Sequence, residues 1–294
     1  MAGISRRGLL KASARLLAGG VTGSALGWFY STVVEPEWLQ VEQIRLPLTK
    51  LHPDLNGFTI AHFSDIHFGP YMRGPDAQQI VDQVNRLRPD LIVFTGDFVT
   101  ELAHGEAELI TDMFRRLKAA QGVYAILGNH DHWTEAEVVD QAVRAAGVTL
   151  LRNENRLIEF GGTGFWLAGV DDVWEEKHDL GAALLGVGDD LPVILLAHEP
   201  DYADEVERTG RVDLQLSGHS HGGQVRLPYY GALALPYLAH KYPIGLYQLG
   251  STTLYTNRGV GLLAPPVRFN CRPEITLFEL SRPAATDELQ HSIL

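Results

Sequence analysis

The stretch LIVFTGD, residues 91–97, decides how this sequence is expected to fold. It opens with an unbroken apolar run, which is typical of a strand buried on both faces of a sheet. It ends in a glycine and an aspartate. The stretches FTIAHFSD, residues 58–65, and VYAILGNHD, residues 123–131, have the same form. The sequence therefore predicts three buried strands that each run into a polar loop.

Amphipathic stretches separate and follow these strands. Residues 75–90 and 107–122 carry apolar side chains at helical spacing. Residues 134–147 form a third predicted helix, opened by a capping box of Thr134 and Glu137. The first half of the chain is therefore expected to alternate between strands and helices.

The second half is richer in strands. Between residues 148 and 280, most stretches have the β-branched and aromatic composition of strands. Strand–helix alternation followed by strands predicts an α/β sandwich with two sheets. No linker divides residues 58–280, so this range is predicted to be one catalytic domain, followed by a C-terminal tail at 281–294.

The N-terminus has the composition of an export signal. Paired arginines, leucines and a lysine occur in SRRGLLK, residues 5–11, and residues 16–34 carry no charge. Such a run is long enough to cross a bilayer core of about 30 Å. The pattern predicts a twin-arginine signal and membrane anchor at 1–34, recognised by the twin-arginine translocase, and a tether and lead-in at 35–57. The alternative is an ordinary amphipathic helix.

The charges around the apolar run predict its orientation. Arginines and a lysine precede it, whereas Glu35 and Glu37 follow it, which places the N-terminus inside the cell. The catalytic domain is therefore expected at the extracytoplasmic side of the cell membrane. If the signal is cut near residues 23–25, the protein is instead secreted or released into the cell envelope.

The composition of the 294-residue chain excludes one class of partner. Its formal charge is −12 and it has no lysine–arginine cluster, so no nucleic-acid partner is expected. The single cysteine, Cys271, excludes an internal disulfide and is interpreted as a small buried apolar residue.

Polar side chains gather where the predicted strands end. They are Asp65, His67, Asp97, Asn129, His130, Asp131, His198, His219 and His221. Ligands bind at the carboxyl ends of strands in open α/β sheets. Imidazole nitrogens mixed with carboxylate and amide oxygens suit zinc, manganese, iron or cobalt. Seven of these residues acting as ligands exceed what one tetrahedral ion takes, and with Asp97 as a bridge they suit two ions about 3.5–4 Å apart, a phosphoryl-transfer arrangement.

The stretch SGHSHGGQ, residues 217–224, places two histidines one residue apart among glycines. Residues two apart in an extended segment face the same way, so His219 and His221 are expected to reach neighbouring ions. The glycines allow the backbone to approach the cluster and turn sharply.

Taken together, these motifs resemble those of the calcineurin-like metallophosphoesterases. The matching residues are Asp65-x-His67, Gly96-Asp97, Gly128-Asn129-His130-Asp131, His198 and Gly218-His219-x-His221. The set spans residues 58–280 and is highly specific, although each motif alone is weak. The stretch GHSHGGQVRLP and the export signal further resemble the bacterial membrane-associated phosphodiesterase branch, which includes UDP-2,3-diacylglucosamine hydrolases. The resemblance implies a four-layer α/β/β/α sandwich of two mixed sheets.

The resemblance also implies a role for each motif residue. Two divalent ions (Mn, Zn or Fe) are expected, one held by Asp65, His67, Asp97 and His221 and the other by Asp97, Asn129, His198 and His219. His130 would lie beside the substrate and stabilise or protonate the leaving oxygen, and Asp131 would orient His130 by a hydrogen bond. The expected reaction is attack on phosphorus by a hydroxide that bridges the ions.

The expected activity is hydrolysis of a phosphodiester or pyrophosphate, with a lipid-linked or nucleotide-sugar-linked substrate suggested by the membrane attachment. The alternatives are a phosphomonoesterase or protein phosphatase on the same site, and a metal-binding cell-envelope adaptor without turnover. The intact His130 argues against the adaptor.

Three further features have two interpretations each. Arg258 either clamps a phosphate or forms a structural ion pair. His132 is interpreted as a satisfied histidine without a role, although it adjoins a motif. The apolar residues 227–247 either face lipid or pack on the core, and packing on the core is the favoured interpretation.

Overall fold

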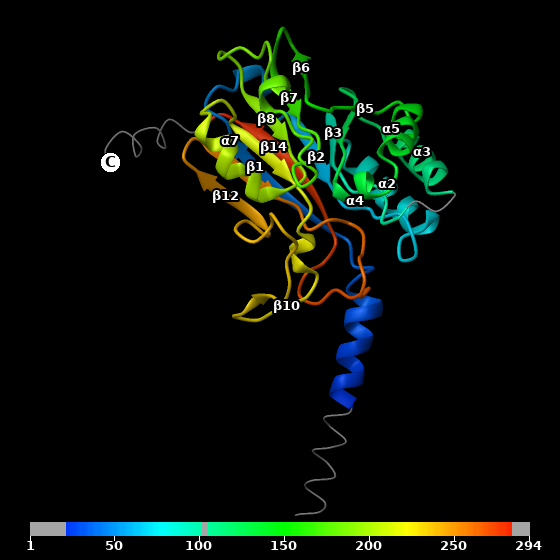
Figure 1. The fold of residues 1–294 in the computed structure, drawn as a ribbon. Coiled ribbons are helices and arrows are strands. Elements are labelled where there is room, and N and C mark those ends of the chain that lie inside the picture. The colour runs from blue at the N-terminus through cyan, green and yellow to red at the C-terminus, as the bar shows by residue number, and fades with distance from the viewer. Residues whose placement is uncertain (1–21, 102–104, 284–294) are drawn as a thin grey trace, which may run out of the picture.

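The computed structural model describes residues 22–101 and 105–283. It begins with a helix over residues 22–29, which continues as the π-helix η1 (Tyr30–Val34) and projects from one end of the domain (Figure 1). Most of the predicted export signal lies outside the described residues. None of the helices in the described ranges has the length and apolarity of a membrane span.

Two six-stranded sheets form the centre of the domain. The first sheet has, in spatial order, β1 (Gln40–Pro47), β14 (Glu274–Ser281), β2 (Thr59–Phe63), β3 (Leu91–Thr95), β4 (Val123–Ile126) and β5 (Thr149–Leu150). Its strand pairs are parallel except β14 with β2. The second sheet has β12 (Gly245–Leu249), β13 (Thr252–Thr256), β9 (Leu214–Ser217), β8 (Val193–Leu196), β7 (Thr163–Gly169) and β6 (Glu154–Phe160), with antiparallel pairs at both edges.

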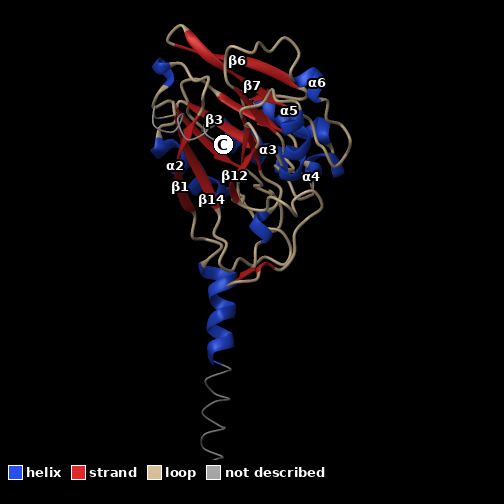
Figure 2. Cartoon of the chain, turned by 90° about the vertical axis from the view of Figure 1, so that its left-hand side faces the viewer, coloured by secondary structure: helices blue, strands red, loops and turns tan. Residues whose placement is uncertain are grey.

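Helices cover the outer face of each sheet (Figures 1 and 2). The first sheet carries α2 (Gly74–Leu87), α3 (Glu106–Arg115) and α5 (Ala136–Ala145), and the second carries the shorter α6 (Leu180–Ala183) and α7 (Ala203–Arg208). Strand β3 shows why the first sheet needs cover on both faces, because its apolar side chains alternate between the two faces. Ile92 and Phe94 pack among the helices, whereas Leu91 and Val93 pack against the second sheet. The expected α/β/β/α sandwich of two mixed sheets is confirmed.

Residues 40–47 differ from the sequence-based expectation. The tether and lead-in predicted at 35–57 contains strand β1, which pairs with β14 from Gln40–Glu274 to Pro47–Ser281. Only Leu46 of this strand is buried, so its composition lacks the apolar run that identified the inner strands. This part of the segment therefore belongs to the first sheet.

The third helix also begins differently from the prediction. Helix α5 has no side-chain cap. Thr134 Oγ1 instead donates to the carbonyls of His130 and Asp131, at the end of α4 (Asn129–Trp133). The predicted capping box at Thr134 is wrong, because its hydroxyl already closes the preceding helix.

Residues 227–247 do not pack on the core, contrary to the favoured interpretation. Ala239 is the only buried residue of this stretch. The hairpin of β10 (Arg226–Leu227) and β11 (Gly231–Ala232) carries Tyr229 and Tyr230, both largely in solvent. The sequence cannot distinguish an apolar loop that is covered from one that is not, because composition alone does not fix burial.

Candidate metal centre

The polar residues predicted at five strand ends lie together in the structure. Strands β2, β3 and β4 end just before Asp65, Asp97 and Asn129, and strands β8 and β9 of the other sheet end before His198 and His219. The strands run parallel within each sheet, so their carboxyl ends meet at one edge of the sandwich. The residues predicted at the strand ends therefore lie together at this edge of the sandwich.

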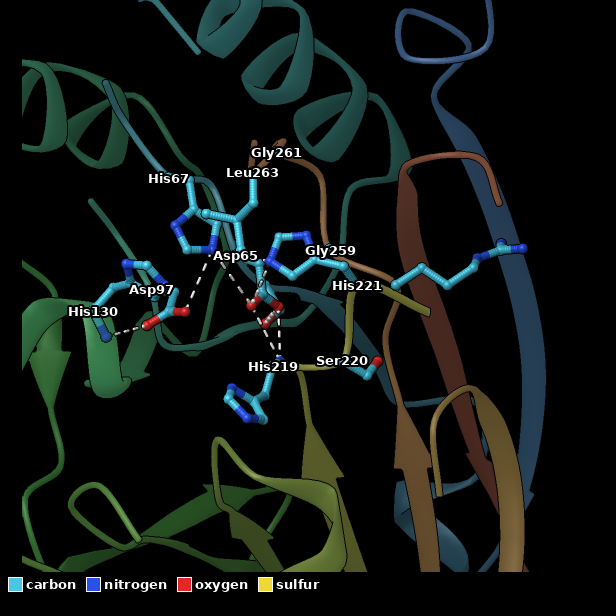
Figure 3. A network of polar contacts seen from close by, with 12 residues as sticks. Asp65, His67, Asp97, His130, His219, Ser220, His221, Gly259, Gly261 and Leu263 are labelled. Atoms are coloured by element: carbon cyan, nitrogen blue, oxygen red, sulfur yellow. Dashed lines mark hydrogen bonds and ion pairs between the residues drawn. The ribbon is translucent and has the colours of Figure 1, made fainter. Parts of the chain in front are cut away.

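A first cluster joins Asp65, His67 and His221, which could hold one metal ion. The Nε2 atoms of His67 and His221 lie 2.9 Å apart. Asp65 Oδ1 lies 3.4 Å from Nε2 of His221 and 3.9 Å from Nε2 of His67. Figure 3 shows these side chains pointing toward one another from two segments, the loop after β2, which carries Asp65 and His67, and the turn that carries His221.

A second cluster joins Asp97, His198 and His219. Asp97 Oδ2 lies 3.2 Å from His198 Nε2, and His219 Nδ1 lies 3.2 Å from the same nitrogen. Backbone carbonyls fix both imidazoles. His198 Nδ1 donates to Thr95 O at 2.6 Å and His219 Nε2 donates to Tyr237 O at 2.7 Å, so the opposite nitrogen of each ring faces the cluster.

Asp97 connects the two clusters. Its Oδ2 is also 3.3 Å from Nε2 of His67, a member of the first cluster. Its Oδ1 accepts a hydrogen bond from the backbone nitrogen of His130 at 3.0 Å. Asn129, which directly precedes His130, is buried, and its Oδ1 has no hydrogen-bond partner in the described structure. A buried acceptor without a donor beside clustered carboxylates and imidazoles fits a cation.

The protonation of three of the four ligand histidines agrees with this fit; for His198, burial lowers the pKa, but the Asp97 carboxylate beside it raises the pKa well above its usual value. Burial lowers the pKa of His67 to about 3 and that of His219 to about 4, and it also holds the pKa of His221 well below its usual value. These imidazoles are therefore neutral near pH 7, which is the form that binds metals. Burial raises the pKa of Asp65 to about 7, and the nearby Asp97 adds to the rise although His198 opposes it. A cation would favour its ionised form.

The backbone of the site is strained. Asp65, His67, Asp97, His219 and His221 have φ angles of 54°, 53°, 61°, 67° and 48°. Non-glycine residues seldom adopt this left-handed region, and such residues cluster at functional sites. The argument that His219 and His221 share a face of an extended segment is therefore wrong. A tight turn, which continues into the 3₁₀ helix η4 (His221–Gly223), brings both histidines to Asp65.

Glycine is required beside Asp97. A Cβ atom on Gly128 would lie 2.3 Å from Asp97 Oδ1 and 2.8 Å from the Asp97 backbone nitrogen. Neither atom can move away freely, because Asp97 faces both clusters and its backbone follows a buried strand. Gly128 therefore sets how closely the loop after β4 approaches the loop after β3.

A Gly128→Ala variant is expected to lose turnover by about 100-fold, the cost of a misplacement of about 1 Å at a reacting centre. Its metal content should fall as well. Turnover of bis(p-nitrophenyl) phosphate and elemental analysis of the same sample measure both effects. Gly188→Ala is the matched control, since nothing lies within 4 Å of its added Cβ. Equal turnover in the two variants would contradict the close approach at Gly128.

Asp131 has a different role from the one expected. Its carboxylate accepts hydrogen bonds from the backbone nitrogens of Asp97, Phe98, Val99 and Gly128, at 2.9–3.3 Å. The ring nitrogen Nδ1 of His130 instead donates to the carbonyl of Thr100 at 3.0 Å. The expectation that Asp131 orients His130 by hydrogen bonding is therefore wrong. Asp131 holds together the loops that present Asp97 and Asn129.

Arg268 is a site-supporting residue that the sequence did not reveal. It is completely buried, and its guanidinium donates to the carbonyls of Arg258, Gly259, Gly261 and Cys271. The same loop contacts the metal centre, because Val260 N donates to Ser64 O and Gly261 N to Asp65 O. Several backbone carbonyls converging on one buried arginine are a tertiary feature, for which the sequence holds no local signal.

An Arg268→Met variant is expected to be about 3 kcal/mol less stable, because buried carbonyls lose a charged donor. The free energy of unfolding in urea measures this loss. Arg156→Met on the exposed strand β6 serves as the control, where we expect a change below about 1 kcal/mol. Two variants of the same stability would show that the Arg268 hydrogen bonds contribute nothing.

The remaining alternatives are resolved by contacts. Arg258 Nη2 pairs with Glu42 at 2.8 Å and its Nε pairs with Glu274, so the structural ion pair is confirmed. His132 Nε2 lies 2.7 Å from Asp171 Oδ1, which agrees with a satisfied histidine outside the metal centre. Cys271 is buried, as expected.

An aromatic wall stands beside the metal centre. It consists of Trp133, Trp174 and Tyr237. The ring centroid of Trp174 lies 5.1 Å from that of Trp133 and 5.4 Å from that of Tyr237. Trp133 lies 4.7 Å from the ring of His130, and Trp174 lies 5.6 Å from that of His219. Trp133 and Tyr237 remain about half exposed, so the wall offers apolar surface next to the site. Trp133 ends helix α4, whereas Trp174 and Tyr237 lie in loops far away in the sequence, so no sequence pattern groups the three residues.

A sandwich of two sheets with imidazoles and carboxylates converging at its strand ends defines a class of metal-dependent hydrolases. The chain belongs to the calcineurin-like phosphoesterase family, whose model matches residues 58–223. This confirms the resemblance found in the sequence. It also confirms the enzyme class, a metal-dependent phosphoric ester hydrolase, and the use of divalent metals.

Named relatives cover almost the whole chain. It is 36% identical over 280 residues to the uncharacterized metallophosphoesterase YkuE of Bacillus subtilis, covering 94% of this chain and 98% of the relative. It is 32% identical over 280 residues to the phosphodiesterase YaeI of Escherichia coli, covering 94% and 99%. A transmembrane protein with a metallophosphoesterase domain from Danio rerio is 32% identical over 250 residues, covering 81% of this chain and 56% of the relative.

Proposed function

We propose that the protein hydrolyses phosphodiesters with two divalent cations that share Asp97. The observation that carries this proposal is the position of Asp97 Oδ2, which lies within 3.3 Å of a nitrogen in each cluster. The residues that would hold the cations are Asp65, His67, Asp97 and His221 for one and Asp97, Asn129, His198 and His219 for the other. When bound, such cations neutralise phosphoryl oxygens and lower the pKa of water to about 7.

His130 is the group placed to act on the leaving oxygen. Its ring is half-buried at the edge of the centre and packs edge-on against His67 with centroids 4.7 Å apart. Thr100 O accepts its Nδ1–H, which leaves Nε2 for the substrate. In the protonated form, Nε2 donates a proton to the departing alkoxide.

The aromatic wall favours a diester over a monoester. A phosphomonoester carries one organic group, whereas a diester carries a second group that needs a surface beside the phosphate. Trp133 packs on His130, the Tyr237 carbonyl accepts the hydrogen bond from His219, and both side chains offer half-exposed apolar surface there. The name of the Escherichia coli relative, a phosphodiesterase, is in line with this preference.

Relative rates on two chromogenic esters test the proposal. Full-length protein supplied with Mn²⁺ is expected to hydrolyse bis(p-nitrophenyl) phosphate faster than p-nitrophenyl phosphate, and to lose both activities in EDTA. The reverse order of rates would favour the phosphomonoesterase. Hydrolysis of neither ester by metal-loaded protein would favour the non-catalytic adaptor.

We also propose that the enzyme acts at the outer side of the cell membrane on a lipid-linked or sugar-nucleotide-linked diester or pyrophosphate. The arginine pair and the uncharged residues 16–34 support export and anchoring. Fractionation of cells that express the full chain, with protease added to intact spheroplasts, tests this location. Protein in the soluble cytoplasmic fraction would contradict it.

A further inference from the structure

We infer that the hairpin after the metal centre rests in the interface of a lipid bilayer, on the same membrane that the N-terminal helix enters. The surface concerned is the apolar lip, which we define as Leu227, Tyr229, Tyr230, Leu233 and Tyr237. Their exposed fractions are 41%, 109%, 75%, 55% and 59%. Five large apolar or aromatic side chains in one short stretch, all left in water, need a partner.

The N-terminal helix exposes a second apolar surface at the same end of the molecule. Leu26, Trp28, Phe29 and Val33 are 64%, 69%, 54% and 49% exposed. Figure 1 places the β10–β11 hairpin at the end of the domain from which this helix projects. The lip and the helix therefore face the same side.

A short segment fixes the hairpin relative to the helix. Arg268 N donates to Ser31 O at 2.9 Å, and the rings of Phe269 and Tyr30 meet edge-on with centroids 6.4 Å apart. On its other side, Phe269 pairs with the base of the hairpin, because its nitrogen donates to Gln224 O and its carbonyl accepts from Arg226 N, both at 2.9 Å. A membrane that the N-terminal helix enters would therefore also contact the apolar lip.

The chemistry of the lip fits lipid. Tyrosine places an apolar ring and a polar hydroxyl at the boundary between acyl chains and headgroups. Residues 227–247 contain no acidic side chain, although the chain as a whole carries a formal charge of −12. The uncharged run of residues 16–34 begins before the described helix, so the sequence that leads into this helix has the composition suited to a bilayer.

The lip reaches the metal centre at its far end. Tyr237 O accepts the hydrogen bond that fixes His219, and the Tyr237 ring packs on Trp174. A lip seated among headgroups would therefore hold the metal centre close to ester groups in the membrane. This last step rests on the proposed function, whereas the seating of the lip does not.

A cysteine-labelling experiment tests the seating directly. The native Cys271 is buried and burial raises its pKa, so a thiol-reactive dye labels an introduced surface cysteine. Tyr229→Cys carries an NBD dye on the lip. Leu185→Cys is the matched control, since Leu185 is also a large apolar residue, 78% exposed, and lies outside the lip.

Full-length labelled protein is reconstituted into vesicles of phosphatidylcholine and phosphatidylglycerol. We expect the dye at position 229 to brighten, to shift to the blue and to be quenched by brominated acyl chains, while the dye at position 185 behaves as in water. A dye at 229 that stays in water in these vesicles, which contain no other protein, overturns the inference and favours a protein partner.

Activity separates this inference from the proposed function. The double variant Tyr229→Ser, Tyr230→Ser should keep the wild-type rate on soluble bis(p-nitrophenyl) phosphate and lose about tenfold on a phosphodiester lipid in the same vesicles. Equal losses on both substrates would contradict an interfacial role. If the wild type hydrolyses neither substrate, the proposed function fails, and the dye measurement still decides where the lip lies.

Discussion

An Asp97→Asn variant is expected to turn over bis(p-nitrophenyl) phosphate about 1000-fold more slowly than the wild type, since stabilisation of several kcal/mol by bound cations is lost and each 1.36 kcal/mol is tenfold in rate. Asparagine keeps the shape of the side chain and removes its negative charge. Because Asp97 Oδ2 faces nitrogens of both clusters, affinity at both sites should fall together. Elemental analysis of the purified variant should find fewer ions per chain than in the wild type.

Asp90→Asn is the matched control, because Asp90 lies at the opposite end of strand β3. Its carboxylate accepts hydrogen bonds from the backbone and the hydroxyl of Thr59, both at 2.8 Å, and touches no cluster. This variant should keep its metal content and its turnover. An Asp97→Asn protein with a full set of ions and wild-type turnover would contradict a carboxylate shared between two cations.

The inner strands and their polar ends were predictable because each carries its own signal. A strand buried on both faces needs an apolar run. A residue that directly follows such a strand lies at the edge of the sheet where the strands end. This is why the sequence alone predicted that Asp65, Asp97, Asn129, His198 and His219 follow strand ends, where the structure places them. The edge strand β1 was missed because it is buried at Leu46 alone, so the apolar run that marks an inner strand is absent.

Contacts between loops had no such signal. The family resemblance implied that Asp131 orients its neighbour His130, whereas the carboxylate accepts hydrogen bonds from backbone nitrogens after β3 and β4. Which nitrogens it meets depends on the left-handed φ angle of Asp97, 61°, and on the close approach of Gly128. Arg268 gathers carbonyls that only the folded loop brings together. These features follow from tertiary geometry, which local propensity does not encode.

A His130→Ala variant is expected to lose about 10²–10⁴-fold in turnover while keeping its metal ions, because a positioned proton donor contributes this much to ester cleavage. The metal measurement is decisive. His130, His67 and Asp97 each offer an atom within 4.8 Å of the others, so the geometry alone would also permit His130 to act as a ligand. A loss of metal that accompanies the loss of turnover would assign His130 to the metal centre instead.

The choice of leaving group sharpens this test. p-Nitrophenolate departs with little help from a proton donor, whereas a simple alkoxide needs one. The His130→Ala variant should therefore lose far more turnover on a dialkyl phosphodiester, which can release only an alcohol, than on bis(p-nitrophenyl) phosphate, which releases nitrophenolate. His132→Ala is the control, since His132 adjoins the motif but binds Asp171, and it should keep its turnover on both leaving groups. An equal loss for both leaving groups in His130→Ala would mean that the imidazole stabilises phosphoryl charge and transfers no proton, because only proton transfer depends on the basicity of the departing oxygen.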